Sequence, residues 1–375
     1  MSIQRVLCVF GTRPDAIKMA PVVLELQGRP TDFDVRIAVT GQHREMLDQV
    51  LSVFRITPHF DLDIMTHGQT LSQVTTRALS GLDPILAEFK PNWVLAQGDT
   101  TTTFAAALVA FYHRCSFGHV EAGLRTGNRF DPFPEEMNRL LTTRLTTKHF
   151  APTQDAVNNL RAEGVLETDI LLTGNTVIDA LLDIAGREYA IADPVVEEIL
   201  SDSRRVILVT AHRRENWGEP MSRIGQAVKM LVDKHPDTLA VVALHRNPLV
   251  RESLRPILEG HNRVHLIEPP DYVPFVKLEQ KATLILTDSG GVQEEAPSLG
   301  KPVLVLRETT ERPEGVAAGT AMLVGTDIQR IIAEASRLLS DPNAYAAMAR
   351  AASPYGDGHA SVRIVDGLVA AGDHI

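Results

Sequence analysis

Short runs of apolar and β-branched residues alternate with longer segments of helical periodicity, and this alternation constrains the fold more than any other feature of the chain. In the first half the apolar runs are residues 6–10, 35–39, 93–96, 117–120 and 170–172. In the second half they are residues 206–210, 239–244, 264–267, 284–287 and 303–306. Helical patterns such as 46–54 and 104–112 lie between them. This βαβ rhythm predicts parallel sheets with helices on both faces.

The rhythm pauses once, around residues 185–203, where Gly186 and Pro194 stand among mixed charges. A chain of 375 residues, 44% of them hydrophobic, exceeds the size at which a single hydrophobic core keeps growing. We therefore expect two α/β domains, residues 1–173 and 174–358, with the hinge following Gly174.

The net charge of -10 disfavours partners that are polyanions, because their average interaction with the chain would be repulsive. The N-terminal apolar run, residues 6–10, is too short for a signal-peptide core, and the run at residues 104–112 is far below a membrane span. Cys8 and Cys115 lie in or beside apolar runs, as is typical of buried thiols in a reducing cytosol. We expect a cytoplasmic protein that binds neither nucleic acid nor a membrane.

Polar and charged residues follow five of the predicted strands. These segments are Gly11-Thr12-Arg13 with Lys18, Gln97-Gly98-Asp99-Thr100, Glu121-Ala122-Gly123-Leu124-Arg125, Ala211-His212-Arg213-Arg214-Glu215 and Asp288-Ser289-Gly290-Gly291. Taken singly, each has an ordinary structural explanation as a turn, a helix cap or a solvated surface group. Ligands of open α/β sheets bind beyond the carboxyl ends of the strands, so the five together predict a ligand site.

The turn after the first strand carries no dinucleotide fingerprint, since it reads Gly11-Thr12-Arg13-Pro14 rather than G-x-G-x-x-G. No phosphate-binding P-loop motif occurs anywhere in the chain. His212 and Glu215 do not reproduce a His-Glu-x-x-His zinc helix, and no run of carboxylates resembles a magnesium site. We expect no cofactor and no metal.

The segment Asp288-Ser289-Gly290-Gly291 is the best candidate for binding phosphate. It follows an apolar run and begins a helical segment, where free backbone amides and the positive helix end favour anions and glycines allow close approach. Glu294 and Glu295 are expected in the first turn of that helix, either to complement its dipole or to accept hydrogen bonds from ribose hydroxyls. Arg312 could add a fixed positive charge.

The first half supplies candidate acid–base groups. Asp99 and Glu121 each follow a strand, while Glu135 and Glu136 begin a helix that has Pro134 at its first position. An apolar stripe is expected to form the buried face of that helix: Met137, Leu140, Leu141 and Leu145. Three carboxylates in one place would repel one another and raise at least one pKa toward neutrality.

The same residues carry a family resemblance. The segments that carry it are Gly11–Lys18, Gly41–Leu47, Gly98–Thr103, His119–Arg125, Pro132–Glu136, Asn175–Asp179, His212–Glu215, Asp288–Pro302 and Pro354–Gly358. Together they resemble the bacterial non-hydrolysing UDP-N-acetylglucosamine 2-epimerases over nearly the whole chain. The resemblance implies a glycosyltransferase-B fold, in which two Rossmann-like domains face a cleft and a C-terminal helix, residues 359–375, returns to the first domain. It also implies a homodimer.

The resemblance further implies roles for individual residues. The catalytic or substrate-contacting positions are Asp99, Glu121, Glu135 and His212. The nucleotide-sugar contacts are Arg13, Lys18, Phe275, Ser289, Gly290, Gly291, Glu295 and Arg312. A second UDP-N-acetylglucosamine could bind as an activator beside Gln42, His43, Gln69 and His245. The alternative for Gln42 and His43 is that they only cap the following helix.

The chemistry favours elimination over oxidation, because the proton on C2 of such a sugar is not acidified by a carbonyl and the chain lacks an NAD fingerprint. Loss of UDP from C1 with deprotonation of C2 would give an acetamidoglucal, which re-adds UDP with protonation from the other side. Rival hypotheses stay open: a glycosyltransferase of the same fold, a non-catalytic nucleotide-sugar sensor, a hydrolysing relative, and a relative acting on a diacetamido uronic acid sugar.

Overall fold

The computed structural model of the chain describes residues 3–41, 44–66 and 68–372 and divides into two compact units. Unit 1 comprises Met1–Ala180 with Tyr355–Ile375, and unit 2 comprises Leu181–Pro354. The division falls inside helix α7 (Thr176–Gly186), whereas the sequence analysis placed the boundary at residue 174. A helix that runs through the division shows no change of periodicity there, so the pattern alone cannot locate it.

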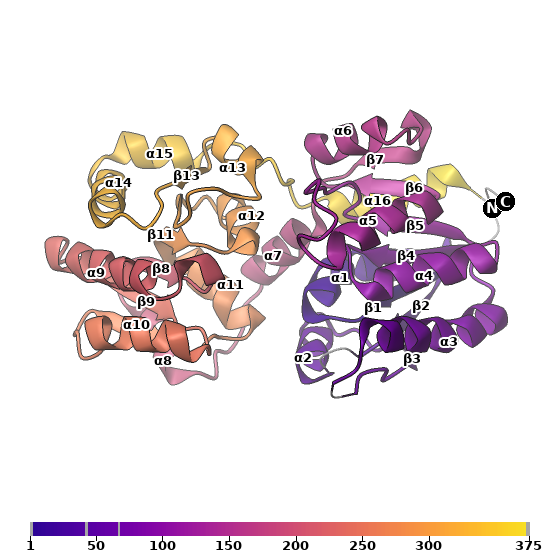
Figure 1. Cartoon of the computed structure of the whole chain (residues 1–375), viewed down its shortest axis with the longest axis horizontal. Helices are drawn as coiled ribbons and strands as arrows, with labels where there is room; N and C mark the ends of the chain where they lie inside the picture. The colour runs from indigo at the N-terminus through magenta and orange to yellow at the C-terminus, as the bar shows by residue number, and fades with distance from the viewer. Residues whose placement is uncertain (1–2, 42–43, 67, 373–375) are drawn as a thin grey trace. The chain divides into compact units, whose positions relative to one another are not determined.

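Unit 1 is built on a seven-stranded parallel sheet with the order β3-β2-β1-β4-β5-β6-β7 (Figure 1). Helices α3, α4 and α5 pack in sequence beside one another, and α1 contacts both α2 and α16. Its strands are β1 (Gln4–Phe10), β2 (Phe33–Val39), β3 (Phe60–Asp61), β4 (Trp93–Gln97), β5 (Ser116–Val120), β6 (Lys148–Ala151) and β7 (Ile170–Leu172). Its helices are α1 (Arg13–Gln27), α2 (Arg44–Phe54), α3 (Leu71–Phe89), α4 (Thr101–Tyr112), α5 (Glu135–Leu145), α6 (Gln154–Ala162), the start of α7, and α16 (Ala360–Ala371).

Unit 2 contains a six-stranded parallel sheet with the order β10-β9-β8-β11-β12-β13. Its strands are β8 (Arg205–Thr210), β9 (Thr238–Ala243), β10 (Val264–Ile267), β11 (Ala282–Thr287), β12 (Val303–Val305) and β13 (Ala321–Leu323). Its helices are α8 (Pro194–Ser201), α9 (Glu219–Lys234), α10 (Pro248–Leu258), α11 (Tyr272–Lys281), α12 (Gly290–Ser298), α13 (Pro313–Ala317), α14 (Ile328–Ser340) and α15 (Pro342–Ala349).

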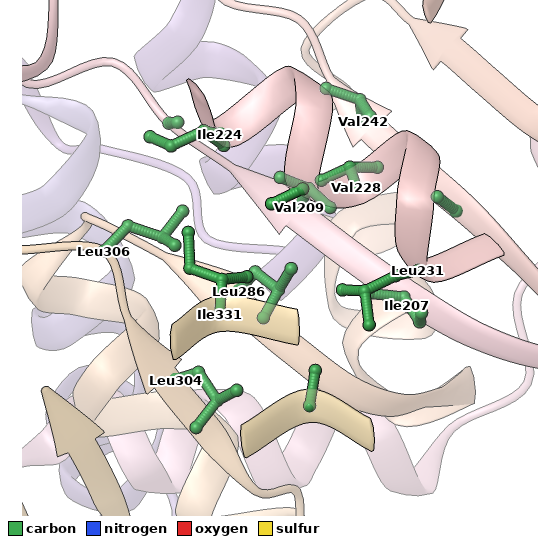
Figure 2. Packing of buried hydrophobic residues seen from close by; sticks show 14 of the residues in the cluster. Ile207, Val209, Ile224, Val228, Leu231, Val242, Leu286, Leu304, Leu306 and Ile331 are labelled. Atoms are coloured by element: carbon green, nitrogen blue, oxygen red, sulfur yellow. The ribbon is translucent and has the colours of Figure 1, made fainter. Parts of the chain in front are cut away.

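Alternate residues of strand β8 enter two different hydrophobic clusters, so both faces of the sheet in unit 2 are covered. Ile207 and Val209 pack with side chains of α9 and α14, among them Ile224, Val228 and Ile331 (Figure 2). Val206 and Leu208, which point the other way, pack with side chains of α8, α11 and α12. Burial on both faces explains why the strands read as continuous apolar runs rather than as alternating patterns.

The predicted parallel α/β architecture is confirmed, and each predicted strand matches an observed strand to within two residues at each end. Three strands of the structure were not predicted: β3, β6 and β13. Strands β3 and β13 are two and three residues long, too short to show a period. Strand β6 contains Lys148 and His149, which interrupt its apolar character.

Candidate functional site

The strand order reverses once in each sheet, between β1 and β4 in unit 1 and between β8 and β11 in unit 2. In open α/β sheets these switch points are where ligands bind, because the loops that follow the two strands diverge there. The polar segments predicted from the sequence follow β1, β4 and the adjacent β5 in unit 1, and β8 and β11 in unit 2. Each switch point is therefore lined by the residues singled out in the sequence.

At the end of β1, the chain turns directly into α1 with a capping box. The Thr12 side chain accepts from the amide of Asp15, and the Asp15 carboxylate accepts from the amides of Gly11 and Thr12. A side chain at Gly11 could not be accommodated, since an added Cβ would lie 2.1 Å from Thr40 Oγ1. This turn places the half-buried Arg13 at the first position of the helix, beside the switch point.

Glu121 follows β5 and is fixed by three donors. Its carboxylate lies 2.5 Å from Lys18 Nζ and accepts hydrogen bonds from the side-chain amides of Gln97 and, at 2.9 Å, Asn175. The residue has a φ of +64°, a conformation that non-glycine residues rarely adopt, and it is 7% exposed. The contacts with Lys18, Gln97 and Asn175 hold this strained, buried side chain in one orientation.

Asp99 lies in the loop between β4 and α4 and is more accessible, with 31% of its side chain exposed. Burial raises the pKa of Asp99, the guanidinium of Arg139 lowers it, and the Glu121 carboxylate raises it again. Smaller opposing effects come from Lys18 and Glu135. The net direction is upward.

Helix α5 begins at Glu135, as predicted, but two expectations about it are wrong. Pro134 is the N-cap residue rather than the first helical residue. The buried face of the helix is polar and consists of Glu136, Asn138, Arg139, Thr142 and Thr143, whereas Leu141 of the predicted apolar stripe is exposed. The polar face is turned inward because Arg139 pairs with Asp99 and Glu136, and Asn138 donates to the backbone carbonyl of Asp99. Glu135 itself is half-buried.

In unit 2 the side chain of Asp288 organises the loop after β8. This carboxylate is completely buried and accepts hydrogen bonds from the amides of His212 and Arg213 and from the side chain of Asn216, all between 2.9 and 3.0 Å. Its Oδ1 atom also lies 3.4 Å from His212 Nδ1. The segment Asp288–Gly291 was predicted from the sequence to bind phosphate. Within it, the Asp288 side chain holds the loop that carries His212.

The imidazole of His212 is stacked on that of His245, with ring centroids 5.4 Å apart and an interplanar angle of 20°. Burial lowers the pKa of His212, although the Asp288 carboxylate opposes this effect. His245 and Arg213 lower it further. The lowered pKa favours the neutral ring of His212, which has one nitrogen free to accept a proton.

The N-terminus of α12 is the segment for which an anion site is predicted. Ser289 is the N-cap and makes no side-chain capping hydrogen bond, and the helix begins with Gly290 and Gly291. A Cβ added to Gly290 would lie 3.7 Å from Arg213 Nη2 and 3.9 Å from the Arg312 guanidinium. Two guanidinium groups thus lie next to backbone that is free to approach an anion.

Glu294 and Glu295 were expected in the first turn of α12, and this is wrong because the helix begins at Gly290 and both residues fall in its second turn. Both are buried. Glu294 accepts a hydrogen bond from Arg312 Nε and so orients that guanidinium. Phe275, on α11, packs partly buried against the core cluster that also contains Val292 of α12.

The candidate activator residues are described only in part. Gln42 and His43 lie outside the described residues. Gln69 Oε1 accepts hydrogen bonds from Arg77 and from Thr66. His245 accepts at Nδ1 from the amide of Asn247 and stacks on His212, as described above.

The sequence analysis did not single out Arg139 or Arg213 as site residues. Arg139 could have been noticed, because it stands three residues after Glu136 and the two therefore share one face of the predicted helix. Arg213 lies in one of the five strand-end segments, but its proximity to Gly290 depends on the pairing of β8 with β11, which the sequence does not reveal.

Across the described residues, no cluster of His, Cys, Asp and Glu has the arrangement needed to hold a metal ion. Within the same residues, no helix has the length and apolar character needed to cross a membrane.

A family model for UDP-N-acetylglucosamine 2-epimerase matches residues 25–369. The chain belongs to the UDP-N-acetylglucosamine 2-epimerase family. It is 54% identical to the UDP-N-acetylglucosamine 2-epimerase of Escherichia coli K12 over 370 residues, covering 97% of this chain and 98% of the relative.

Solved structures agree with this family assignment. The UDP-GlcNAc 2-epimerase of Neisseria meningitidis, solved with bound UDP-GlcNAc, superimposes with a TM-score of 0.85 at 51% identity, covering 98% of this chain and 100% of that one. The glycosyltransferase SnogD from Streptomyces nogalater shares the fold, with a TM-score of 0.63 at 16% identity over 99% and 100% of the two chains. The expected glycosyltransferase-B type of fold is therefore confirmed.

Proposed function

We propose that this epimerase-family chain interconverts UDP-N-acetylglucosamine and UDP-N-acetylmannosamine by inverting C2 of the sugar. The observation that carries the proposal is the division of chemistry between the two switch points. In unit 2, the start of α12 with Arg213 and Arg312 suits a diphosphate. In unit 1, Asp99 and Glu121 supply carboxylates of different character: the pKa of Asp99 is raised, and Glu121 is held by Lys18 and Asn175.

The proposed reaction proceeds by elimination and re-addition. A base removes the proton from C2, the C1–O bond to the diphosphate breaks with its electron pair leaving on UDP, and a C1=C2 double bond forms in the acetamidoglucal. UDP then re-forms the C1–O bond while C2 takes a proton on its opposite face. The carbon skeleton is neither oxidised nor reduced, so this route requires no redox cofactor.

We propose that the residues of unit 2 act on the diphosphate of the substrate. Arg312, oriented by Glu294, and the free amides of α12 stabilise the charge that develops on the departing UDP. His212, whose Nδ1 lies beside the Asp288 carboxylate, can donate a hydrogen bond from Nε2 to the same group when its ring is protonated. Asp99, Glu121 and Glu135 are the groups available for proton transfer.

The remaining nucleotide-sugar contacts implied by the resemblance are also proposed for this chain. Arg13 and Lys18 lie on α1, at the switch point of unit 1, where Lys18 pairs with Glu121. Phe275 and Glu295 lie on α11 and α12 of unit 2. We propose that Phe275 contacts the uracil ring and that Glu295 accepts hydrogen bonds from the ribose hydroxyls.

Incubation with UDP-N-acetylglucosamine alone in deuterated water, followed by proton NMR, tests the proposal. The expected result is a UDP-N-acetylmannosamine anomeric signal together with deuterium at C2. A glycosyltransferase would leave the sugar nucleotide unchanged without an acceptor, and a sensor would bind it without exchange at C2. Release of free N-acetylmannosamine would indicate the hydrolysing activity. A reaction that occurs only when a diacetamido uronic acid sugar nucleotide is supplied would indicate an enzyme specific for that sugar.

A second UDP-N-acetylglucosamine is proposed as an activator, with Gln42, His43, Gln69 and His245 as its contacts. The stack of His245 on His212 supports this proposal, since it joins a candidate activator residue directly to a candidate catalytic one. An activator must bind the active conformation more tightly than the inactive one. The reverse reaction, started from UDP-N-acetylmannosamine alone, should then show a lag that a trace of UDP-N-acetylglucosamine shortens. A reverse reaction with no lag and no such response would exclude the activator site.

The homodimer and the cytoplasmic location stay predictions from the resemblance and the composition. Sedimentation of the purified protein at micromolar concentration would measure the first, and fractionation of the source cells the second.

A further inference from the structure

The guanidinium group of Arg139 is shared between two carboxylates on the buried side of α5. Its Nη1 atom lies 2.5 Å from Asp99 Oδ2, while Nη2 and Nε lie 2.7 and 3.0 Å from Glu136 Oε2. The Arg139 side chain is only 9% exposed. Because a buried guanidinium loses little of its field to solvent, its charge acts strongly on both partners.

Glu136 is the structural partner of this arrangement. It is almost completely buried and accepts hydrogen bonds from the amides of Thr126 and Gly127 as well as from Arg139. Burial raises the pKa of Glu136, but the bonds from Arg139, Thr126 and Gly127 outweigh it and lower the pKa below its usual value. Glu136 is therefore an anion at any pH at which the protein works, and it holds the Arg139 side chain in position.

Asp99 is the partner that can change its charge. Its side chain is 31% exposed, whereas that of Glu136 is 2% exposed, so Asp99 alone of the two can reach a substrate. Besides Arg139, the charged groups near Asp99 are Glu121 after β5, Glu135 on α5, and Lys18 and Asp15 on α1. Of the cations, Arg139 contacts the Asp99 carboxylate directly, whereas Lys18 pairs with Glu121.

We propose that Arg139 is a positioning residue which, held by Glu136, determines the pH at which Asp99 takes up and releases the proton of the epimerisation. The proposal rests on the proposed function only in assigning that proton to the C2 reaction. It treats Asp99 as the exchanging carboxylate, because Glu121 already accepts hydrogen bonds from Lys18, Gln97 and Asn175. Arg139 itself touches no reacting atom.

Two substitutions shift the charge balance at Asp99 in opposite directions. Arg139→Gln removes the positive charge, so Asp99 should hold its proton to a higher pH and the acid limb of the kcat profile should move upward. Glu136→Gln removes a negative charge, so that Asp99 is the one carboxylate still paired with Arg139. Asp99 should then lose its proton at a lower pH, and the acid limb of the kcat profile should move downward. A role in folding alone would lower the rate of both variants without moving the limb in opposite directions.

The experiment measures kcat for UDP-N-acetylglucosamine epimerisation between pH 5 and pH 9. The ratio of wild-type to Arg139→Gln activity should be larger at the acid end of this range than at pH 8. It should approach about tenfold, for each unit by which the pKa is displaced, once the pH is below both pKa values. Arg139→Lys should restore part of the wild-type profile. Arg144→Gln, on the same helix but exposed, is the matched control and should keep the wild-type profile. Limbs that coincide in wild type, Arg139→Gln and Glu136→Gln would overturn the proposal.

A second measurement separates this proposal from the proposed function. Carboxyl ¹³C NMR of the full-length protein with labelled aspartate, using Asp99→Asn to identify the resonance, follows the titration of Asp99 without any turnover. An upward displacement in Arg139→Gln and a downward one in Glu136→Gln would support the proposal even if wild type failed to epimerise the sugar. If Arg139→Gln does not fold, Glu136→Gln and Arg139→Lys decide alone, and an unmoved Asp99 titration in both would refute the role of Arg139.

Discussion

Replacement of Glu279 by glutamine should make the protein less sensitive to alkaline pH. Glu279 lies on α11, is completely buried, and neither of its carboxyl oxygens has a hydrogen-bond partner within the part of the chain that the structure describes. Burial raises the pKa of Glu279 well above its usual value, and the nearby Glu295 carboxylate raises it further. The folded protein therefore keeps a proton that the unfolded chain has released, and the free energy of unfolding falls as the pH rises.

The size of this effect follows from proton linkage. One bound proton changes the free energy of unfolding by about 1.4 kcal/mol for each pH unit between the unfolded and folded pKa values. Between pH 5 and pH 8, the free energy of unfolding of wild type should fall by up to about 4 kcal/mol more than that of Glu279→Gln. For a unit of this size that corresponds to a difference in Tm of up to about 8 to 16 °C.

Thermal unfolding at a series of pH values, followed by calorimetry, measures this difference. The glutamine amide is itself a buried polar group, so it destabilises the protein by the same amount at every pH. The informative quantity is therefore the slope of Tm against pH. Glu252→Gln, an exposed glutamate of α10, is the control and should run parallel to wild type. Parallel curves for wild type and Glu279→Gln would show that Glu279 is not protonated in the folded state.

Three further outcomes are expected from other parts of the structure. Turnover of UDP-N-acetylglucosamine should fall by roughly 10² to 10⁴, the span for a positioned proton-transfer group, in at least one of the isosteric variants Asp99→Asn, Glu121→Gln and Glu135→Gln. Near-normal rates in all three variants would refute the assignment of these carboxylates to proton transfer. Arg13→Ala and Arg312→Ala should each weaken UDP binding, measured by calorimetry, by about 1.5 to 3 kcal/mol, and unchanged affinity in both would argue against these contacts. Gly123→Ala should lower the free energy of unfolding in urea by about 2 kcal/mol or more, because Gly123 has a φ of +93° and a Cβ would lie 2.4 Å from a backbone oxygen of α6. A loss below about 0.5 kcal/mol would mean that the backbone there relaxes at little cost.

The sheets could be predicted from the sequence because their strands are buried on both faces. A strand such as β8, whose alternate residues enter separate clusters, must be apolar at every position, and such runs are visible without knowledge of the fold. The switch points were less accessible, since they depend on strand order. The sequence showed that Asp99 and His212 follow strands, but not that β4 lies beside β1 or that β11 lies beside β8.

Helix α5 shows where periodicity gives the wrong answer and why. Its leucines suggested an apolar buried face, yet the face turned toward the protein carries Glu136 and Arg139. Burying two such charges is unfavourable unless each finds a partner, and the partner of Arg139 beyond its own helix is Asp99, forty residues earlier in the chain. The local spacing shows only that Glu136 and Arg139 share one face of the helix, whereas the tertiary contact with Asp99 is not visible in any local pattern. A polar face that is retained against its local cost points to function, and here it leads from a buried guanidinium directly to Asp99, a carboxylate of the unit 1 switch point that is more exposed than Glu121.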